Sequence, residues 1–134
     1  MARRSYGQEC PVARSLDILG ERWTLLIIHE LLNGEARFSE LSVKLSGIPS
    51  NLLSARLKTL EEIGLVRRTL YSNHPPRAYY GLTEAGEALR PVLEALHGWG
   101  LQYGMRIRPE SAREAARRIR AGRRRRLEPH SLSA

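Results

Sequence analysis

The residues that could carry chemistry are few and scattered. Cys10 is the single cysteine, so a disulfide could form only with another molecule, and no thiolate-rich zinc site fits within one subunit. The four histidines, His29, His74, His97 and His130, do not have the spacing of metal ligands. The sequence shows no paired carboxylates, no nucleophile with a base and no phosphate-binding glycine loop. We therefore expect no catalytic residue, no metal site and no cofactor.

The net charge of +8 suggests an anionic partner, but the charge is unevenly distributed. After residue 104, ten Arg against three Glu give a net charge of +7, which leaves +1 for residues 1–104. The Arg-rich segment is either an arm that binds phosphates or a solvated tail. Any evidence for nucleic-acid binding by the folded part must therefore come from its own residues.

The length of 134 residues, with 42% hydrophobic residues, predicts one globular domain. The longest uncharged, mostly apolar run, residues 23–28, is far shorter than the roughly 20 residues of a membrane span. The basic N-terminus has no apolar stretch behind it, so we expect no secretory signal, no membrane partner and a cytoplasmic protein. The expected organisation is an N-terminal arm (1–9), one domain (10–105) and an Arg-rich tail (106–134), disordered or marginally helical.

Hydrophobic periodicity predicts helices in the first third of the chain. Val12, Leu16 and Leu19 recur at helical spacing before Gly20, which suits the left-handed position after a helix. Residues 23–32 are apolar on nearly every side and stop at an Asn-Gly pair. Their length and this stop favour a helix in the middle of the core over a continuous strand, and we place Trp23 in that core.

Two further helices have the arrangement of a helix-turn-helix. A brief helix is predicted from residue 38 with Ser39 as its cap, and Gly47 and Pro49 break it. Ser50 is predicted to cap a longer helix over residues 50–63. Its inner positions, Leu53, Leu57 and Leu60, continue at the same spacing to Gly64 just after it. Its opposite face is small and polar. Two such helices joined by a tight turn that contains glycine are typical of a helix-turn-helix.

A β-hairpin and a closing helix complete the predicted domain. Residues 65–71 and 77–82 favour β structure and flank a turn-rich stretch, which predicts a hairpin. Thr83 is expected to cap the next helix, and Pro91 to kink or restart it. The predicted fold class is mainly α with a small β-hairpin, a winged helix-turn-helix.

The polar face of the 50–63 helix is suited to the major groove of DNA, which is about 12 Å wide. Asn can bond adenine in two places, Ser can bond bases or phosphates, and Arg and Lys neutralise phosphates. A polar helix face is often only solvated, so it is the predicted hairpin beside this face that favours DNA binding. The candidate DNA-binding residues are Ser39, Ser50, Asn51, Ser54, Arg56 and Lys58 on the helices, with Arg67 and Arg77 on the hairpin.

With these elements in place, the chain resembles the HxlR-type bacterial transcription regulators over roughly residues 10–100. The resemblance lies in an ordered set of short motifs. They include Cys10-Pro11-Val12, Arg22-Trp23-Thr24-Leu25-Leu26-Ile27, Arg37-Phe38-Ser39-Glu40-Leu41, Gly64-Leu65-Val66, Pro75-Pro76-Arg77, Leu82-Thr83 and Trp99-Gly100. The chain departs from the family pattern at Arg22, where Lys is common, at Gly81 in the second hairpin strand, and in the Arg-rich tail.

The resemblance implies a homodimer whose first and last helices form the interface. The residues expected there include an apolar stripe with coiled-coil spacing. The alternative is that this stripe packs on the domain of its own subunit. The expected interface residues are Val12, Leu16, Leu89, Val92, Leu96, Trp99 and Tyr103. Each subunit would bind one half-site of a pseudo-palindromic operator in double-stranded DNA, with half-sites about 34 to 36 Å apart.

The resemblance also gives Cys10 a hypothetical role, because members of that family sense oxidants or electrophiles through a cysteine at this position. The expected helix start at Cys10 would favour a thiolate. A structural or unregulated thiol is the alternative. The leading hypothesis is a sequence-specific repressor with an oxidant or another small molecule as effector. The alternative function is a winged-helix module that binds proteins and takes non-specific nucleic-acid affinity from its tail.

Overall fold

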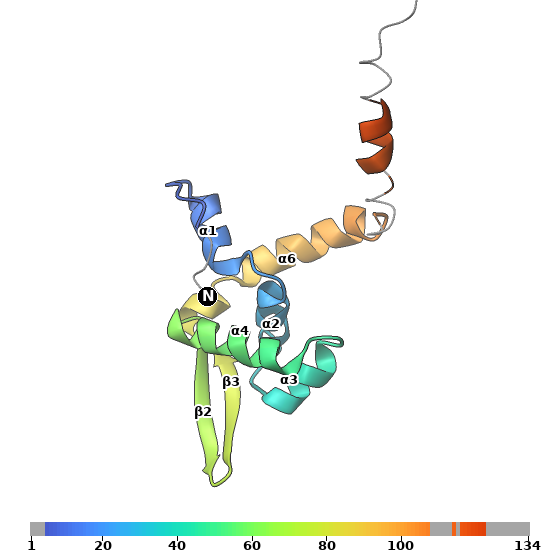
Figure 1. The fold of residues 1–134 in the computed structure, drawn as a ribbon. Helices are drawn as coiled ribbons and strands as arrows, with labels where there is room; N and C mark the ends of the chain where they lie inside the picture. Colours follow the sequence, from blue (N-terminus) through green and yellow to red (C-terminus); the bar gives the residue numbers. More distant parts are fainter. Residues whose placement is uncertain (1–4, 108–113, 115, 123–134) are drawn as a thin grey trace, which may run out of the picture. The chain divides into compact units, whose positions relative to one another are not determined.

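The computed structural model describes residues 5–107, 114 and 116–122. The chain forms two compact units, residues 1–93 and 94–134. The elements in chain order are α1 (Pro11–Leu19), α2 (Thr24–Leu31), β1 (Ala36–Arg37), α3 (Phe38–Lys44), α4 (Ser50–Glu62), β2 (Val66–Asn73), β3 (Pro76–Leu82), α5 (Glu84–Glu87), α6 (Arg90–Trp99) and the π-helix η1 (Gly100–Gly104) (Figure 1). This is the mainly helical winged helix-turn-helix that the sequence predicts.

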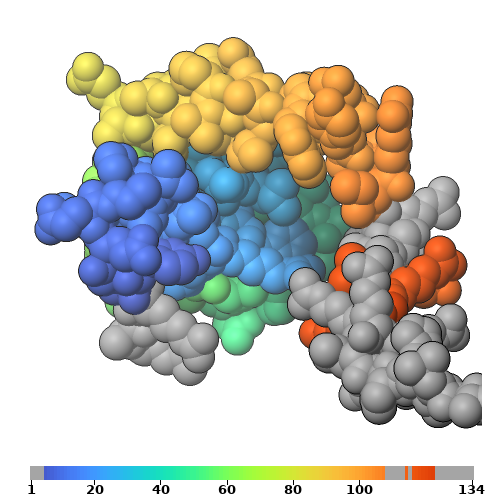
Figure 2. All heavy atoms as spheres, turned by 90° about the horizontal axis from the view of Figure 1, so that it is seen from above, coloured from blue at the N-terminus to red at the C-terminus, as the bar shows by residue number. Residues whose placement is uncertain are grey.

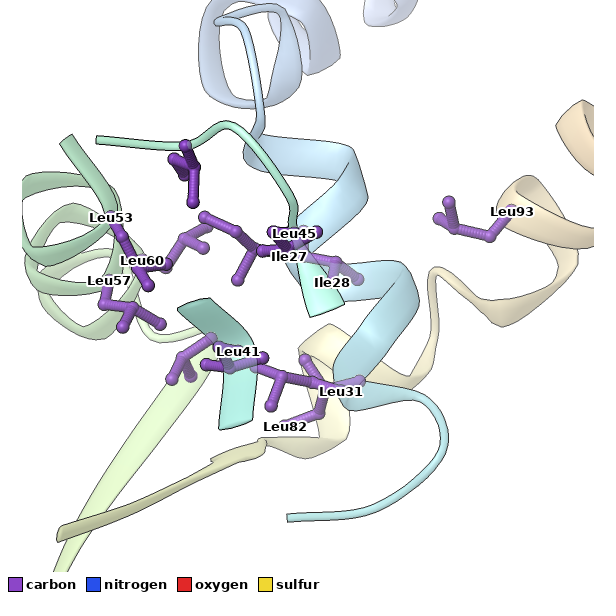
Figure 3. Packing of buried hydrophobic residues seen from close by; sticks show 12 residues of the cluster. Ile27, Ile28, Leu31, Leu41, Leu45, Leu53, Leu57, Leu60, Leu82 and Leu93 are labelled. Atoms are coloured by element: carbon purple, nitrogen blue, oxygen red, sulfur yellow. The ribbon is translucent and has the colours of Figure 1, made fainter. Parts of the chain in front are cut away.

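The core of the first unit is built by α2, α3 and α4. Three of the four predicted inner positions of α4 are confirmed, because Leu53, Leu57 and Leu60 are buried, whereas Gly64 lies beyond the end of the helix and is exposed. The three leucines point toward Ile27 of α2 and Leu41 of α3, which are also buried (Figure 3). The 3.6-residue repeat of α4 thus places its leucines on one side and its small polar residues on the other.

The sheet has three antiparallel strands in the order β1-β3-β2. Strands β2 and β3 form the predicted hairpin, which extends away from α4 in Figure 1. The hairpin is longer than predicted, and a bulge between Leu70 and Ser72 leaves Tyr71 outside the regular register. The sequence did not predict β1, because two residues are too short to show a periodicity. Its pairing of Arg37 with Tyr79 joins the start of α3 to the hairpin.

The predicted caps of the two helix-turn-helix helices are wrong. Arg37, not Ser39, is the N-cap of α3, and its backbone N–H donates to Glu40 Oε1 at 3.1 Å. Pairing in β1 keeps Arg37 extended, so α3 begins at Phe38 and Ser39 lies inside its first turn. The N-cap of α4 is Pro49, whose extended backbone places Ser50 inside the first turn.

Two other helix boundaries agree with the sequence. The Thr83 hydroxyl accepts a hydrogen bond from the Gly86 backbone N–H at 3.2 Å and caps α5, as predicted. Pro91 lies in the first turn of α6, which starts at Arg90 after α5 has ended at Glu87. Of the two expected outcomes, Pro91 therefore accompanies a restart of the helix.

The left-handed residue between α1 and α2 is Trp23, with φ 79°, and not Gly20, which has φ −78°. A glycine is needed at position 20 for a steric reason instead, because a Cβ there would overlap the carbonyl oxygen of Leu16. Trp23 packs against the core but is only half-buried. The Arg22 guanidinium lies 5.7 Å from its ring centroid.

In the second unit, the rings of Trp99 and Tyr103 lie 5.9 Å apart. Residues 116–122 are helical. The rest of the predicted Arg-rich tail, residues 108–113, 115 and 123–134, lies outside the described residues, as do residues 1–4 of the predicted arm. None of the helices in the described part of the chain has the length and apolar character needed to cross a membrane.

The substitution Gly86→Ala is expected to destabilise the protein. A Cβ at position 86 would overlap the carbonyl oxygen of Leu65 and lie 3.0 Å from Cδ2 of Leu82. We expect the free energy of unfolding in urea to fall by about 1 to 3 kcal/mol, the usual cost of overpacking. Gly98→Ala is the matched control, because no described atom lies within 4 Å of its added Cβ, and alanine favours the helix. Unchanged stability of Gly86→Ala would contradict the packing described here.

Candidate nucleic-acid interface

The exposed face of α4 brings together four of the predicted DNA-binding residues. Ser50, Asn51, Ser54 and Lys58 are all exposed, and the last three follow one another at helical spacing. The small side chains lie in the first half of α4 and the lysine lies one turn further. This surface is narrow and polar, and no salt bridge among the described residues engages Lys58.

Arg56 does not lie on that exposed face. Its guanidinium forms an ion pair with Glu21, and Nε donates to the carbonyl oxygen of Arg22 at 3.2 Å. Only 23% of its side chain is exposed. In this structure Arg56 therefore connects α4 to the segment between α1 and α2, a contact across more than 30 residues that local spacing could not predict. Its predicted phosphate contact remains an untested prediction.

The hairpin carries three exposed arginines, Arg67 and Arg68 on β2 and Arg77 on β3. Arg67 Nη2 lies 3.6 Å from Glu35 Oε1, so this predicted DNA-binding residue has a carboxylate beside it. Arg77 lies opposite Ser72 in the strand register, near the hairpin turn. None of the ion pairs in the described ranges includes Arg77. The hairpin thus presents positive charge on the unit that also contains α4.

Arg37 is a further cation at this surface that sequence reasoning did not select. Its guanidinium carbon lies 5.2 Å from the ring centroid of Tyr71 and 5.3 Å from that of Tyr79. Nη2 donates to the Tyr79 hydroxyl at 2.9 Å, and this hydrogen bond raises the pKa of Arg37 above its usual value. The predicted residue Ser39 is exposed in the first turn of α3, two residues away.

The residues predicted for a dimer interface are mostly exposed. In the first unit, α1 lies at the surface (blue in Figure 2), and Val12 is 67% exposed. In the second unit, Trp99 is 56% exposed. Leu89 differs, because it is half-buried and packs against the core of its own subunit. The other exposed members of the set are Leu16, Val92, Leu96 and Tyr103.

Cys10 is exposed and is the N-cap residue of α1. The backbone N–H groups of Ala13 and Val12, at the start of α1, lower the pKa of its thiol. Nearby, the N-terminal arm folds against α1, since the Tyr6 backbone N–H donates to Asp17 Oδ1 at 2.9 Å. Within the described ranges, no group of three or more His, Cys, Asp or Glu residues is placed to hold a metal ion.

Comparison with known proteins agrees with this geometry. A family model described as HxlR-like helix-turn-helix matches residues 18–108. The HTH-type transcriptional regulator YdeP of Bacillus subtilis (strain 168) is 37% identical over 111 residues, which are 82% of this chain and 87% of YdeP.

Solved structures of two regulators are similar to this one. The reduced form of the transcriptional regulator YodB from B. subtilis is 37% identical with a TM-score of 0.60, over 72% of this chain and 95% of YodB. The oxidised form of the redox regulator HypR is 33% identical with a TM-score of 0.65, over 69% of this chain and 96% of HypR.

The winged helix-turn-helix fold and the match to HTH-type transcriptional regulators identify this protein as a transcriptional regulator rather than an enzyme. More particularly, the chain belongs to the HxlR-like helix-turn-helix family, as the resemblance in its sequence indicated.

The contact between Arg56 and Glu21 is expected to stabilise the fold. In a double-mutant cycle of Glu21→Gln and Arg56→Gln, urea unfolding is expected to give a coupling energy of about 0.5 to 1 kcal/mol, because the pair is partly exposed. Arg14→Gln, on an exposed residue of α1, controls for the loss of one positive charge. Additive effects of the two substitutions would show that the pair contributes nothing.

Proposed function

We propose that this protein is a sequence-specific DNA-binding repressor that acts as a homodimer on a pseudo-palindromic operator. The observation that carries the proposal is the small, polar, exposed face of α4, which is held on a helix whose other face is buried in the core. A helix of this kind can enter the major groove with little loss of conformational freedom.

The residues on this face have the chemistry of base recognition. Asn51 is near the N-terminus of α4, where the side chains of a recognition helix contact base edges, and its amide can bond adenine in two places. Ser50 and Ser54 can bond bases or phosphates, and Lys58 can neutralise a phosphate. Asn51 and Ser54 are therefore proposed to provide specificity.

The hairpin is proposed to hold the DNA backbone or the minor groove beside α4. Arg77 lies near the hairpin turn and can contact a phosphate as the structure stands. Arg67 would exchange its contact with Glu35 for a phosphate. Because residues 1–104 carry a net charge of only +1, the DNA affinity of this part of the chain depends on where its cations lie and not on their excess.

A homodimer is proposed because large apolar side chains are exposed on each unit. Val12 and Leu16 on α1, and Leu96, Trp99 and Tyr103 in the second unit, would be removed from water by a second copy of the chain. A two-fold dimer uses the same surface on both subunits and explains why an operator would be pseudo-palindromic. The half-sites would lie about 34 to 36 Å apart.

Selection of bound sites from randomised duplex DNA tests the base contacts. The wild type is expected to yield a palindromic consensus. Asn51→Ala and Ser54→Ala are expected to reduce discrimination at single positions by about 1 to 3 kcal/mol, whereas Arg77→Ala should weaken all sequences alike. Glu62→Ala, at the other end of the same exposed face, should leave the consensus unchanged.

Two outcomes would count against this assignment. An intact consensus in the Asn51 and Ser54 variants would mean that a different surface contacts the bases. Binding of the wild type without any consensus would favour the alternative function, a protein-binding module whose nucleic-acid affinity comes from its Arg-rich tail.

We further propose that an oxidant or electrophile regulates the protein through Cys10. The solved structures similar to this one include a redox regulator, HypR, and YodB in diamide-treated and quinone-bound forms. In this chain, the exposure of Cys10 and the lowered pKa of its thiol favour a reactive thiolate. Because Cys10 is the only cysteine, a disulfide would join two chains, with diamide taking up the two electrons and two protons that the thiols release.

Diamide is expected to abolish binding of the wild type to its selected duplex, and dithiothreitol to restore it. A non-reducing gel should show a cross-linked pair of chains in the same sample. Cys10→Ser should bind the duplex as the wild type does and should be insensitive to diamide. Loss of binding in both proteins, or in neither, would contradict a role for Cys10. The lowered pKa also predicts that iodoacetamide alkylates Cys10 at lower pH than it alkylates free cysteine.

A further inference from the structure

A basic groove lies in the first unit between the start of α3 and the β2–β3 hairpin. Its volume is about 460 Å³, and it is open to solvent. Arginine and aromatic side chains make up most of its lining, and no acidic residue lines it. The lining residues are Arg37, Phe38, Ser39, Arg68, Tyr71, Pro76, Arg77, Ala78 and Tyr80.

Arg37 is the most rigidly held of the three arginines. Its guanidinium contacts the rings of both Tyr71 and Tyr79, which are themselves in contact with centroids 4.7 Å apart. The hydrogen bond to the Tyr79 hydroxyl uses one of five N–H donors, so the others remain available. Glu40 Oε1 lies 3.9 Å from Nε, but both side chains are about half exposed, so this carboxylate only partly offsets the charge.

This arrangement has the chemistry of a phosphate site. Guanidinium groups bind phosphate oxygens through paired N–H donors, and a guanidinium fixed in advance loses less entropy on binding. A small enclosed pocket would suit a small molecule better than this groove, whose openness suits an extended polyanion. Ser39 and Arg77, both predicted to contact DNA, also line it.

We propose that this groove binds a phosphodiester of the DNA strand that passes between α4 and the hairpin. Arg37 is the binding residue whose side chain is already ordered before DNA binds. The proposal rests on the proposed function, because it assumes that α4 and the hairpin engage adjacent grooves of one duplex. It adds Arg37 and Arg68 to the DNA-binding residues and gives Tyr71 and Tyr79 the role of positioning Arg37.

The salt dependence of binding to the selected duplex tests the charge. Arg37→Gln should bind at least about tenfold more weakly, and the slope of log affinity against log salt should fall by about 0.9 for each chain bound. Arg37→Lys should keep the slope but lose affinity, because an ammonium group lacks the planar guanidinium that lies against the two rings and donates paired hydrogen bonds. Arg14→Gln, which also removes an exposed arginine, should leave the slope unchanged. An Arg37→Gln slope equal to that of the wild type would overturn the proposal.

A scan of neutral methylphosphonates through the same duplex locates the contact. Several substituted phosphates should weaken binding of the wild type, because Lys58 and Arg77 are also proposed to contact phosphates. At one of these positions in each half-site, the substitution should have no further effect in Arg37→Gln. Equal losses in both proteins at every position would overturn the proposal. Tyr79→Phe, which keeps the ring and removes the hydrogen bond, should reduce affinity at an unchanged slope. Urea unfolding of each variant separates this loss from loss of folding.

The outcomes distinguish this proposal from the proposed function. Wild-type binding without a consensus would contradict the proposed function. The difference in salt slope between the wild type and Arg37→Gln, measured on any duplex, would still test the groove. If inorganic phosphate alone shifts the amide resonances of residues 37–39 in the wild type but not in Arg37→Gln, and the DNA slope is unaffected, the groove is a site for free phosphate and the DNA assignment is wrong.

Discussion

The packing of Leu53, Leu57 and Leu60 against α2 and α3 holds α4 in one rotational setting. Each of these side chains is buried, and burial of a leucine contributes about 1.5 to 3 kcal/mol. Turning α4 by one residue, about 100°, would expose them and bury polar groups without partners. The core therefore determines that Asn51 and Ser54 face outward, and the proposed recognition surface faces solvent because the opposite face of α4 is buried in the core.

The second constraint is the pairing of β1 with β3. It consists of two residue pairs, yet it joins the start of α3 to the hairpin and places Arg37 opposite Tyr79. A backbone contact between the helix-turn-helix and the wing thereby holds a charged side chain against two aromatic rings. The fold thus separates two tasks. Small polar residues on α4 are suited to base edges, and stacked or exposed arginines around the hairpin are suited to phosphates.

The sequence predicted those features that depend on local spacing. The buried leucines of α4, the hairpin and the cap at Thr83 follow from periodicity and turn chemistry within a few residues. The wrong caps, at Ser39 and Ser50, come from neighbouring backbone that a side-chain preference does not reveal. In the candidate site, Ser50, Asn51, Ser54 and Lys58 were predictable because one helix carries them. The Arg56 contact with Glu21 and the Arg37 contact with Tyr79 were not, because tertiary structure brings those residues together.

We propose above that the exposed face of α4 and the hairpin form one DNA-binding surface. The most direct test is a nitrogen-15 chemical-shift titration of the full chain with its selected duplex. We expect the largest amide shifts at residues 50–58 of α4 and in β2 and β3, with much smaller changes in α1. Large shifts confined to the Arg-rich tail, with α4 unaffected, would contradict it.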